Sequence, residues 1–262
     1  YGIVLEESTI YEEHGKEKFY LGSRKPNFKT ILLILSEIAE RVYCPMGCRH
    51  CYRPARYKKR EWSLIKDNGS KESLTFFSPI EHTKRLVKRW NEDQTLSDVY
   101  DLIISGGEPL MLTNKVTKEI LTELEKAKYL RTLRLCTGTL FLGLPFRIDD
   151  ELIRLFKDFE KSTGRVVSFN VHLSHPSNFS PESILAARKI KEAGFDILTQ
   201  VPLEEGINFW RDDLTKSVEI LIKLARLTQF ILGRRPSKLI LDMQGSVPLE
   251  QALKVFNAVH ET

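Results

Sequence analysis

The chain has 262 residues, of which 42% are hydrophobic and 29% are charged, and its formal net charge is +5. This composition excludes an intrinsically disordered tail, because such segments hold too few apolar residues to form a core. Without a run of about 18 apolar residues, the sequence also excludes a membrane-spanning helix. The length fits one or two domains, and a single α/β barrel would use all of it.

Short apolar runs alternate with amphipathic helical patterns along most of the chain. The pattern predicts strands over 30–35, 99–104, 133–136, 166–173, 196–201 and 238–242. It predicts helices from residue 114 onward and over 149–159, 180–192, 212–227 and 249–260. Such alternation indicates parallel strands joined by right-handed crossovers.

We therefore expect an α/β fold. Six strand–helix units are too few for a closed eight-fold barrel, so the preferred architecture is an open, partial (β/α)6 TIM-like barrel, with a doubly wound sheet as the alternative. Both architectures place chemistry at the carboxyl ends of the strands. Residues 1–28 are polar and weakly patterned and are interpreted as an N-terminal extension, and 29–262 as the core domain. Because the sequence begins at Tyr1 rather than at Met, we allow for residues missing before it.

Cysteine is concentrated in one short loop. Cys44, Cys48 and Cys51 lie within the eight residues C-P-M-G-C-R-H-C, which is too tight for an ordinary disulfide framework. A reducing, cytoplasmic compartment fits this usage, and no signal peptide is visible. The fourth cysteine, Cys136, is far away in a predicted strand and is interpreted as a buried, inert thiol.

Thiolates are soft ligands that suit zinc or an iron–sulfur cluster. A structural zinc ion needs four ligands, and the remaining donor in the loop, His50, lies between two cysteines, where its side chain would diverge from theirs. Three cysteines on a four-iron cluster instead leave one iron open to a small molecule. The C-x3-C-x2-C spacing therefore predicts a [4Fe–4S] cluster. The basic run R-P-A-R-Y-K-K-R at 53–60 is interpreted as a solvated loop, with a contact to phosphate or RNA as the alternative, so a zinc-binding or nucleic-acid-binding module stays an alternative.

The cysteine loop resembles the signature of the radical S-adenosylmethionine (SAM) superfamily, and more closely the cluster loop of the lysine 2,3-aminomutase family. Four further segments resemble segments of that family in the same order, and the resemblance extends over about residues 30–260. They are S-G-G-E-P-L at 105–110, the strand and L-P-F-R-I turn at 134–148, N-V-H-L-S-H-P at 170–176 and Q-V-P-L-E-E-G-I-N at 200–208.

This resemblance implies that Cys44, Cys48 and Cys51 hold a [4Fe–4S] cluster whose open iron is chelated by the amine and carboxylate of SAM. One electron then cleaves a C–S bond of SAM, and the resulting 5′-deoxyadenosyl radical removes hydrogen from a substrate. A partner such as ferredoxin or flavodoxin would supply that electron.

The resemblance also implies a set of SAM-binding residues at strand ends. They are Ser105, Gly106, Gly107, Glu108, His175 and Gln200. Paired glycines let the backbone approach a ligand closely, and Glu108 and nearby backbone carbonyls offer acceptors for the ammonium group of SAM. His175 is expected near the SAM ribose, and Gln200 is expected to contact SAM.

The same family uses pyridoxal phosphate (PLP), bound to a lysine in a Gly-rich segment beyond the sixth strand. No such segment is seen before Thr262, and Asn178 stands where the family has glutamate. We therefore expect SAM chemistry without PLP, on a small-molecule or macromolecular substrate that the sequence does not identify, with catalytic residues unknown. The alternative is a PLP-dependent lysine 2,3-aminomutase-type enzyme whose C-terminal segment is missing from the sequence.

Overall fold

The computed structural model describes most of the chain from residue 78 onward and short segments before it. The described residues are 10–13, 16–19, 30–34, 48, 63–65, 71–73, 78–105, 107–236, 238–241 and 247–260. Two predicted metal ligands, Cys44 and Cys51, and the predicted SAM-binding residue Gly106 lie outside these ranges.

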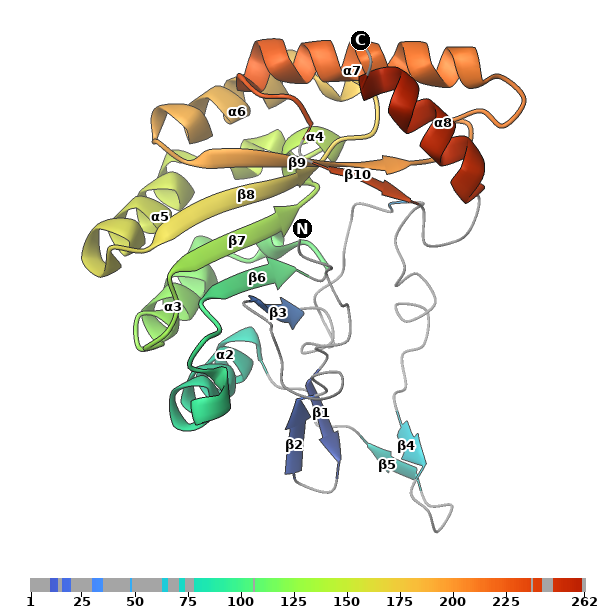
Figure 1. Ribbon diagram of the computed structural model, residues 1–262. Coiled ribbons are helices and arrows are strands. Elements are labelled where there is room, and N and C mark those ends of the chain that lie inside the picture. The colour runs from blue at the N-terminus through green and yellow to red at the C-terminus, as the bar shows by residue number, and fades with distance from the viewer. Residues whose placement is uncertain are drawn as a thin grey trace. The chain divides into compact units, whose positions relative to one another are not determined.

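Six strands form one sheet (Figure 1). They are β3 (Thr30–Ile34), β6 (Asp101–Ser105), β7 (Thr132–Thr137), β8 (Val166–His172), β9 (Asp196–Leu203) and β10 (Lys238–Leu241). Their order is β10-β9-β8-β7-β6-β3, and the described registers of β3 with β6, β6 with β7 and β9 with β10 are parallel. Each strand lies beside the one before it, as in a TIM-like barrel, whereas a doubly wound sheet reverses its order at a switch point. The α/β prediction is confirmed, and the strand order contradicts the doubly wound alternative.

Helices follow most of these strands. They are α2 (Pro79–Glu92), α3 (Asn114–Leu124), α4 (Thr139–Leu142), α5 (Asp150–Thr163), α6 (Pro181–Glu192), α7 (Leu214–Leu232) and α8 (Leu249–His260), with 3₁₀ turns η2 (Gln94–Leu96), η3 (Pro109–Met111), η4 (Pro145–Arg147) and η5 (Pro176–Asn178). Helix α7 ends at Leu232 rather than at residue 227, because Gly233, with a φ of 74°, supplies the left-handed residue that ends a helix. Within the described ranges, no helix is long and apolar enough to span a membrane.

Helix α2 was not among the predicted elements. It begins after Ser78, whose hydroxyl oxygen accepts a hydrogen bond from the backbone N–H of Glu81 (3.2 Å), and Pro79 lies in its first turn. Its buried residues after that turn recur at helical spacing, at Thr83, Leu86, Val87 and Trp90. The Trp90 indole N–H donates to the backbone oxygen of Val99 (3.1 Å) and so ties the end of the helix to the approach to β6.

Two short antiparallel hairpins lie where the sequence pattern predicts no element. One pairs β1 (Ile10–Glu13) with β2 (Lys16–Phe19), and the other pairs β4 (Ser63–Ile65) with β5 (Lys71–Ser73). The first hairpin falls within the predicted N-terminal extension. The boundary between extension and core domain stays a prediction.

By its internal contacts the chain divides into two compact units. The first comprises Tyr1–Val42, Phe76–Cys136 and Arg154–Ser168, and the second comprises Tyr43–Thr75, Thr137–Ile153 and Phe169–Thr262.

In the first unit, three neighbouring strands are tied together near their amino ends. Arg134 of β7 forms an ion pair with Asp101 of β6, and the Thr30 hydroxyl of β3 donates to the same carboxylate (2.6 Å). Asp101 is buried, so loss of one partner would leave an uncompensated charge in the core. The amino ends of these strands are therefore fixed by charge pairing, and their carboxyl ends carry the loops.

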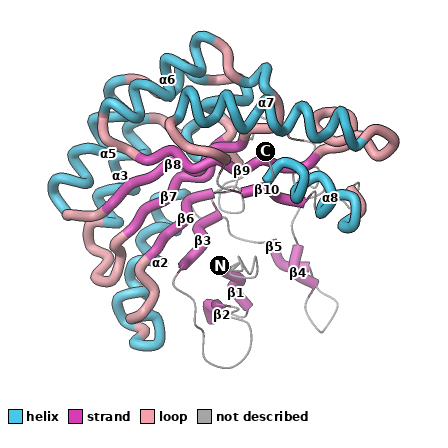
Figure 2. The backbone as a smooth tube through the Cα atoms, turned by 45° about the horizontal axis from the view of Figure 1, so that its top comes forward, coloured by secondary structure: helices cyan, strands magenta, loops and turns pink. Residues whose placement is uncertain are grey.

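In the second unit, helix α6 packs on strand β9 and on helix α7, and α7 packs on α8 (Figures 1 and 2). The Lys191 ammonium at the end of α6 donates to the backbone oxygen of Leu232, the last residue of α7 (2.9 Å). A cation at this place stabilises the helix because it meets the unpaired carbonyls of the last turn. In the core, Phe169 of β8 packs edge to face against Phe195, with 5.6 Å between ring centroids.

We predict that His82 in α2 makes the stability of the protein depend on pH. Burial, with a smaller contribution from the charge of Arg85, lowers the pKa of His82 from 6.5 to about 4. Between these values the unfolded chain binds a proton that the folded chain does not, so the free energy of unfolding falls as the pH drops through this window. The expected contribution is on the order of 3 kcal/mol.

Urea unfolding of the wild type and of His82→Gln at several pH values from 7 to 4 measures this contribution. The stability difference between the two proteins should change across the window, since the remaining titrating groups are common to both. A difference that stays constant from pH 7 to pH 4 would show that His82 does not couple folding to protons.

Candidate functional site

The loop after β6 contains four of the predicted SAM-binding residues. Ser105 is the half-buried last residue of β6, and Gly107 has a φ of 64°, a left-handed conformation that favours glycine. Glu108, 1% exposed, then begins the turn η3, and its Oε1 accepts a hydrogen bond from the backbone N–H of Leu110 (3.2 Å). The carboxylate predicted to face the ammonium group of SAM is thus buried and helps to hold its own loop.

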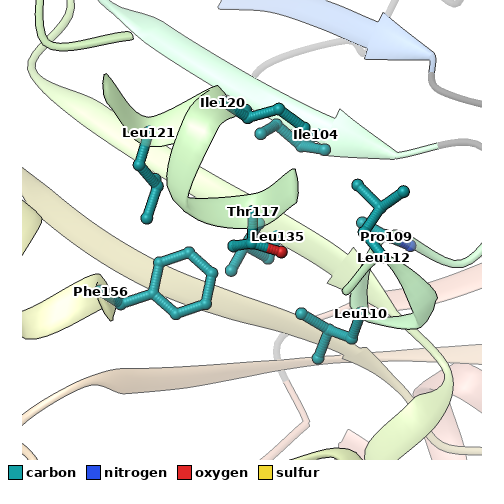
Figure 3. A pocket seen from close by; sticks show the side chains of 9 residues that line it. All are labelled: Ile104, Pro109, Leu110, Leu112, Thr117, Ile120, Leu121, Leu135 and Phe156. Atoms are coloured by element: carbon teal, nitrogen blue, oxygen red, sulfur yellow. The ribbon is translucent and has the colours of Figure 1, made fainter. Parts of the chain in front are cut away.

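Two apolar side chains attach this loop to the core of the first unit. Pro109 and Leu110 line a small apolar pocket between β6, β7 and helices α3 and α5 (Figure 3). Its other lining residues are Ile104, Leu112, Thr117, Ile120, Leu121, Leu135 and Phe156. A pocket with this lining has too few polar partners to hold water or a polar ligand. We therefore interpret it as packing space beneath the Glu108 loop.

The loop after β8 holds His175 in the second unit. The Asn178 side-chain oxygen accepts hydrogen bonds from the backbone N–H groups of Ser174 (2.9 Å) and His175 (2.8 Å). The imidazole Nδ1 of His175 accepts the backbone N–H of Ser177 (3.2 Å) and lies 2.8 Å from the Ser177 hydroxyl oxygen. His175 is half-buried, and its ring is oriented by the turn η5 that it begins.

Gln200 lies inside β9, although the sequence pattern predicts it near the end of a strand. The strand continues to Leu203, because its last residues are buried and pair in register with β10, from Gln200 opposite Lys238 to Leu203 opposite Leu241. The backbone oxygen of Gln200 accepts the N–H of Leu173 (3.0 Å). The residues that follow β8 therefore lie beside Gln200.

A buried asparagine that the sequence analysis did not select joins the ends of β8 and β9. The Asn208 amide donates to the backbone oxygens of Ser174 and Pro202, both at 2.8 Å, and its side-chain oxygen accepts the backbone N–H of Glu204 (2.8 Å). The Ser174 hydroxyl donates to the Glu204 carboxylate (2.8 Å). Asn208, Glu204 and Ser174 are all buried. The only sequence signal was the placement of Asn208 at the end of the resembling segment 200–208.

The structure thus brings some predicted site residues together within each unit. In the second unit, the His175 loop and Gln200 lie on neighbouring strands. In the first unit, Ser105, Gly107 and Glu108 follow one another in the β6 loop. Their roles as ligands of SAM stay predictions.

Of the three predicted cluster ligands, the structure describes Cys48, which is half-buried. Among the described residues, no group of three or more His, Cys, Asp or Glu is arranged to hold a metal ion. Cys136 lies in β7 but is half-buried rather than buried, because Leu135 and Thr137 occupy the buried face of that strand. The assignment of the cluster ligands rests on the sequence.

Comparison with known proteins shows what this chain is similar to. Residues 41–159 match the family model of the 4Fe-4S single cluster domain, and this range contains all three loop cysteines. The chain is also similar to the L-lysine 2,3-aminomutase of Methanococcus maripaludis, with 30% identity over 63% of this chain and 33% of that protein. The same enzyme from Clostridium subterminale is 25% identical over 83% of this chain and 45% of its own length. The glutamate 2,3-aminomutase of Clostridioides difficile is 28% identical over 63% of this chain and 34% of its own length.

These matches confirm the resemblance seen in the motifs. The 4Fe-4S domain match and the aminomutase relatives support an assignment to the radical SAM superfamily, in its lysine 2,3-aminomutase-like family. It spans between 33% and 45% of the length of these three curated relatives.

We predict that Asn208→Ala lowers the free energy of unfolding by about 2–4 kcal/mol, because it leaves the buried N–H of Glu204 and two backbone oxygens without their partner. Urea unfolding monitored by circular dichroism measures this loss.

Asn91→Ala is the matched control. Asn91 also bridges two backbone groups, donating to the oxygen of Lys126 and accepting the N–H of Lys128, both at 2.8 Å, but it does so at an exposed place. Water replaces those partners, so the control should lose less than about 1.5 kcal/mol. Equal losses in the two variants would contradict the role assigned to burial at Asn208.

Proposed function

We propose that this chain carries the radical-generating part of a radical SAM enzyme. In this proposal Cys44, Cys48 and Cys51 bind a [4Fe–4S] cluster, and SAM is cleaved reductively to methionine and a 5′-deoxyadenosyl radical that removes hydrogen from a substrate. The observation that carries the proposal is the C-x3-C-x2-C triplet within the residues that match a 4Fe-4S single cluster domain. The open (β/α)6 barrel is the architecture in which we place this chemistry, and the sequential strand order supports it.

The chemistry of the donor set fits the cluster. Three thiolates are soft ligands for three irons, and the fourth iron is left for the amine and carboxylate of SAM. When bound, the reduced cluster supplies the electron that breaks a C–S bond of SAM.

In this proposal the residues of this chain bind SAM and orient it. Glu108 is a buried acceptor in a loop that Pro109 and Leu110 attach to the core. His175 lies in the loop after β8, and Gln200 lies in the neighbouring strand β9. Loops that are ordered before the ligand arrives lose less conformational freedom on binding, which favours affinity.

We infer that the substrate differs from that of the aminomutases. Asn178 supports this inference: where the family has glutamate, this side chain is uncharged, and its oxygen accepts two backbone N–H groups of its own loop. It therefore offers no negative charge to a substrate amine. The competing proposal, a PLP-dependent aminomutase, is favoured by the names of the longer relatives.

The reaction needs one electron for each SAM that is cleaved, and we propose that a ferredoxin or flavodoxin donates it. A reducing, cytoplasmic location is consistent with three thiols kept available as ligands.

The test is 5′-deoxyadenosine formation under anaerobic conditions, after reconstitution with iron and sulfide and with dithionite as reductant. The wild type should bind iron and sulfide and form 5′-deoxyadenosine, whereas Cys48→Ala should form none above the protein-free background, because the cluster loses a ligand. Cys136→Ala is the matched control, since it removes a thiol outside the triplet and should keep both properties.

Two results would contradict the proposal, and a third would favour its PLP-dependent alternative. A Cys48→Ala variant that still forms 5′-deoxyadenosine would show the ligand assignment to be wrong. One zinc per chain with no iron would indicate a zinc-binding module. A lysine labelled after addition of PLP and reduction with borohydride would support the PLP-dependent aminomutase instead.

A further inference from the structure

We propose that Asn178 is a positioning residue that, with Ser177, holds the His175 imidazole so that its Nε2–H is presented to an oxygen acceptor of the ligand. The proposal rests on the proposed function, because it takes SAM as that ligand. It assigns roles to two residues that the sequence motifs leave without one.

The backbone around His175 is fixed by one side chain. The Asn178 side-chain oxygen accepts the N–H groups of two successive residues, Ser174 and His175, and the Asn178 backbone N–H donates in return to the His175 oxygen (2.9 Å). An amide oxygen has two lone pairs, so both are used within the loop. The backbone of His175, and with it the direction of the Cα–Cβ bond, is thereby fixed before any ligand is bound.

The ring itself is fixed by Ser177. A backbone N–H can only donate, so the contact from the Ser177 N–H to Nδ1 (3.2 Å) requires an unprotonated Nδ1. The Ser177 hydroxyl, 2.8 Å from the same nitrogen, then also acts as a donor. In the neutral ring the proton must lie on Nε2, and His175 acts toward a ligand as a hydrogen-bond donor.

The position of the loop makes this donor accessible. Ser174, just before His175, is hydrogen-bonded to the side chains of Asn208 and Glu204. The backbone N–H of Leu173 donates to the backbone oxygen of Gln200. The His175 ring is half-buried, and among the described residues Nε2 has no hydrogen-bond partner. His175 therefore follows the end of β8, where Leu173 pairs with Gln200 of β9 and where the ligand is proposed to bind.

The test combines the ring ¹⁵N signals of His175 with the affinity for SAM, both measured on the reconstituted protein under anaerobic conditions. The wild-type ring should show the Nε2–H form alone once it is neutral, with the signals assigned through His175→Gln. Asn178→Ala should give a mixture of both tautomers and bind SAM about tenfold more weakly, which corresponds to about 1.4 kcal/mol. Asn178→Asp keeps an acceptor oxygen for both N–H groups and should restore the single tautomer and most of the affinity.

Ser180→Ala is the matched control. The Ser180 hydroxyl, two residues after Asn178, caps helix α6 by accepting the Ser183 N–H (3.2 Å), and the hydrogen bonds described for it go to residues of α6 rather than to His175. This variant should lose stability without changing either the ring signals or the affinity for SAM.

The proposal is overturned if the neutral wild-type ring carries its proton on Nδ1, a result that needs no variant. It is also overturned if Asn178→Ala keeps both the wild-type tautomer and the wild-type affinity, while SAM binding itself supports the proposed function. If the wild type does not bind SAM, the proposed function fails and the ligand of His175 fails with it, whatever tautomer is found.

Discussion

A buried amide fixes how two strand ends meet in the second unit. Asn208 donates to the backbone oxygens of Ser174 and Pro202 and accepts the N–H of Glu204. Because Asn208 is fully buried, water is not available to replace any of these partners. The end of β8 is therefore held against β9, and the loop with His175 starts from a defined place. The ligand-binding roles inferred for this unit depend on that constraint.

The first unit has its buried ion pair and its Glu108 loop at opposite ends of its strands. At the amino ends, the ion pair of Asp101 with Arg134 links β6 to β7. At the carboxyl end of β6, Glu108 lies in a loop whose apolar residues pack into the core. This division is the one expected of parallel α/β folds, where residues beyond the carboxyl ends of the strands change function without disturbing the sheet.

The strands were predictable because a strand in a parallel sheet is a continuous apolar run, as in Leu102 to Ile104. Helix α2 was missed although Ser78 and Pro79 mark its start, since its few apolar residues are widely separated by charged ones. Gln200 was placed too near a strand end, because Pro202 looks like a stop signal although it lies within β9. Asn208 was missed because a polar residue close after a glycine, here two positions after Gly206, is typical of an exposed loop, and its hydrogen-bond partners are 4, 6 and 34 residues away in the sequence.

The predicted site residues in each unit were also only partly predictable from the sequence. The loops at Glu108 and His175 were found by motif, but the hydrogen bonds that orient them come from tertiary packing and follow from no local pattern. Cys44 and Cys51 lie outside the described residues. The assignment of the cluster therefore rests on the spacing of the cysteines and on the match to the 4Fe-4S domain.

The most direct measurement of the central claim is the electron paramagnetic resonance spectrum of the anaerobically reconstituted, dithionite-reduced protein, recorded before and after addition of SAM. We expect the signal of a reduced [4Fe–4S] cluster, and a change in that signal when SAM occupies the open iron. A spectrum without an iron–sulfur signal, or a cluster signal that SAM leaves unchanged, would contradict it.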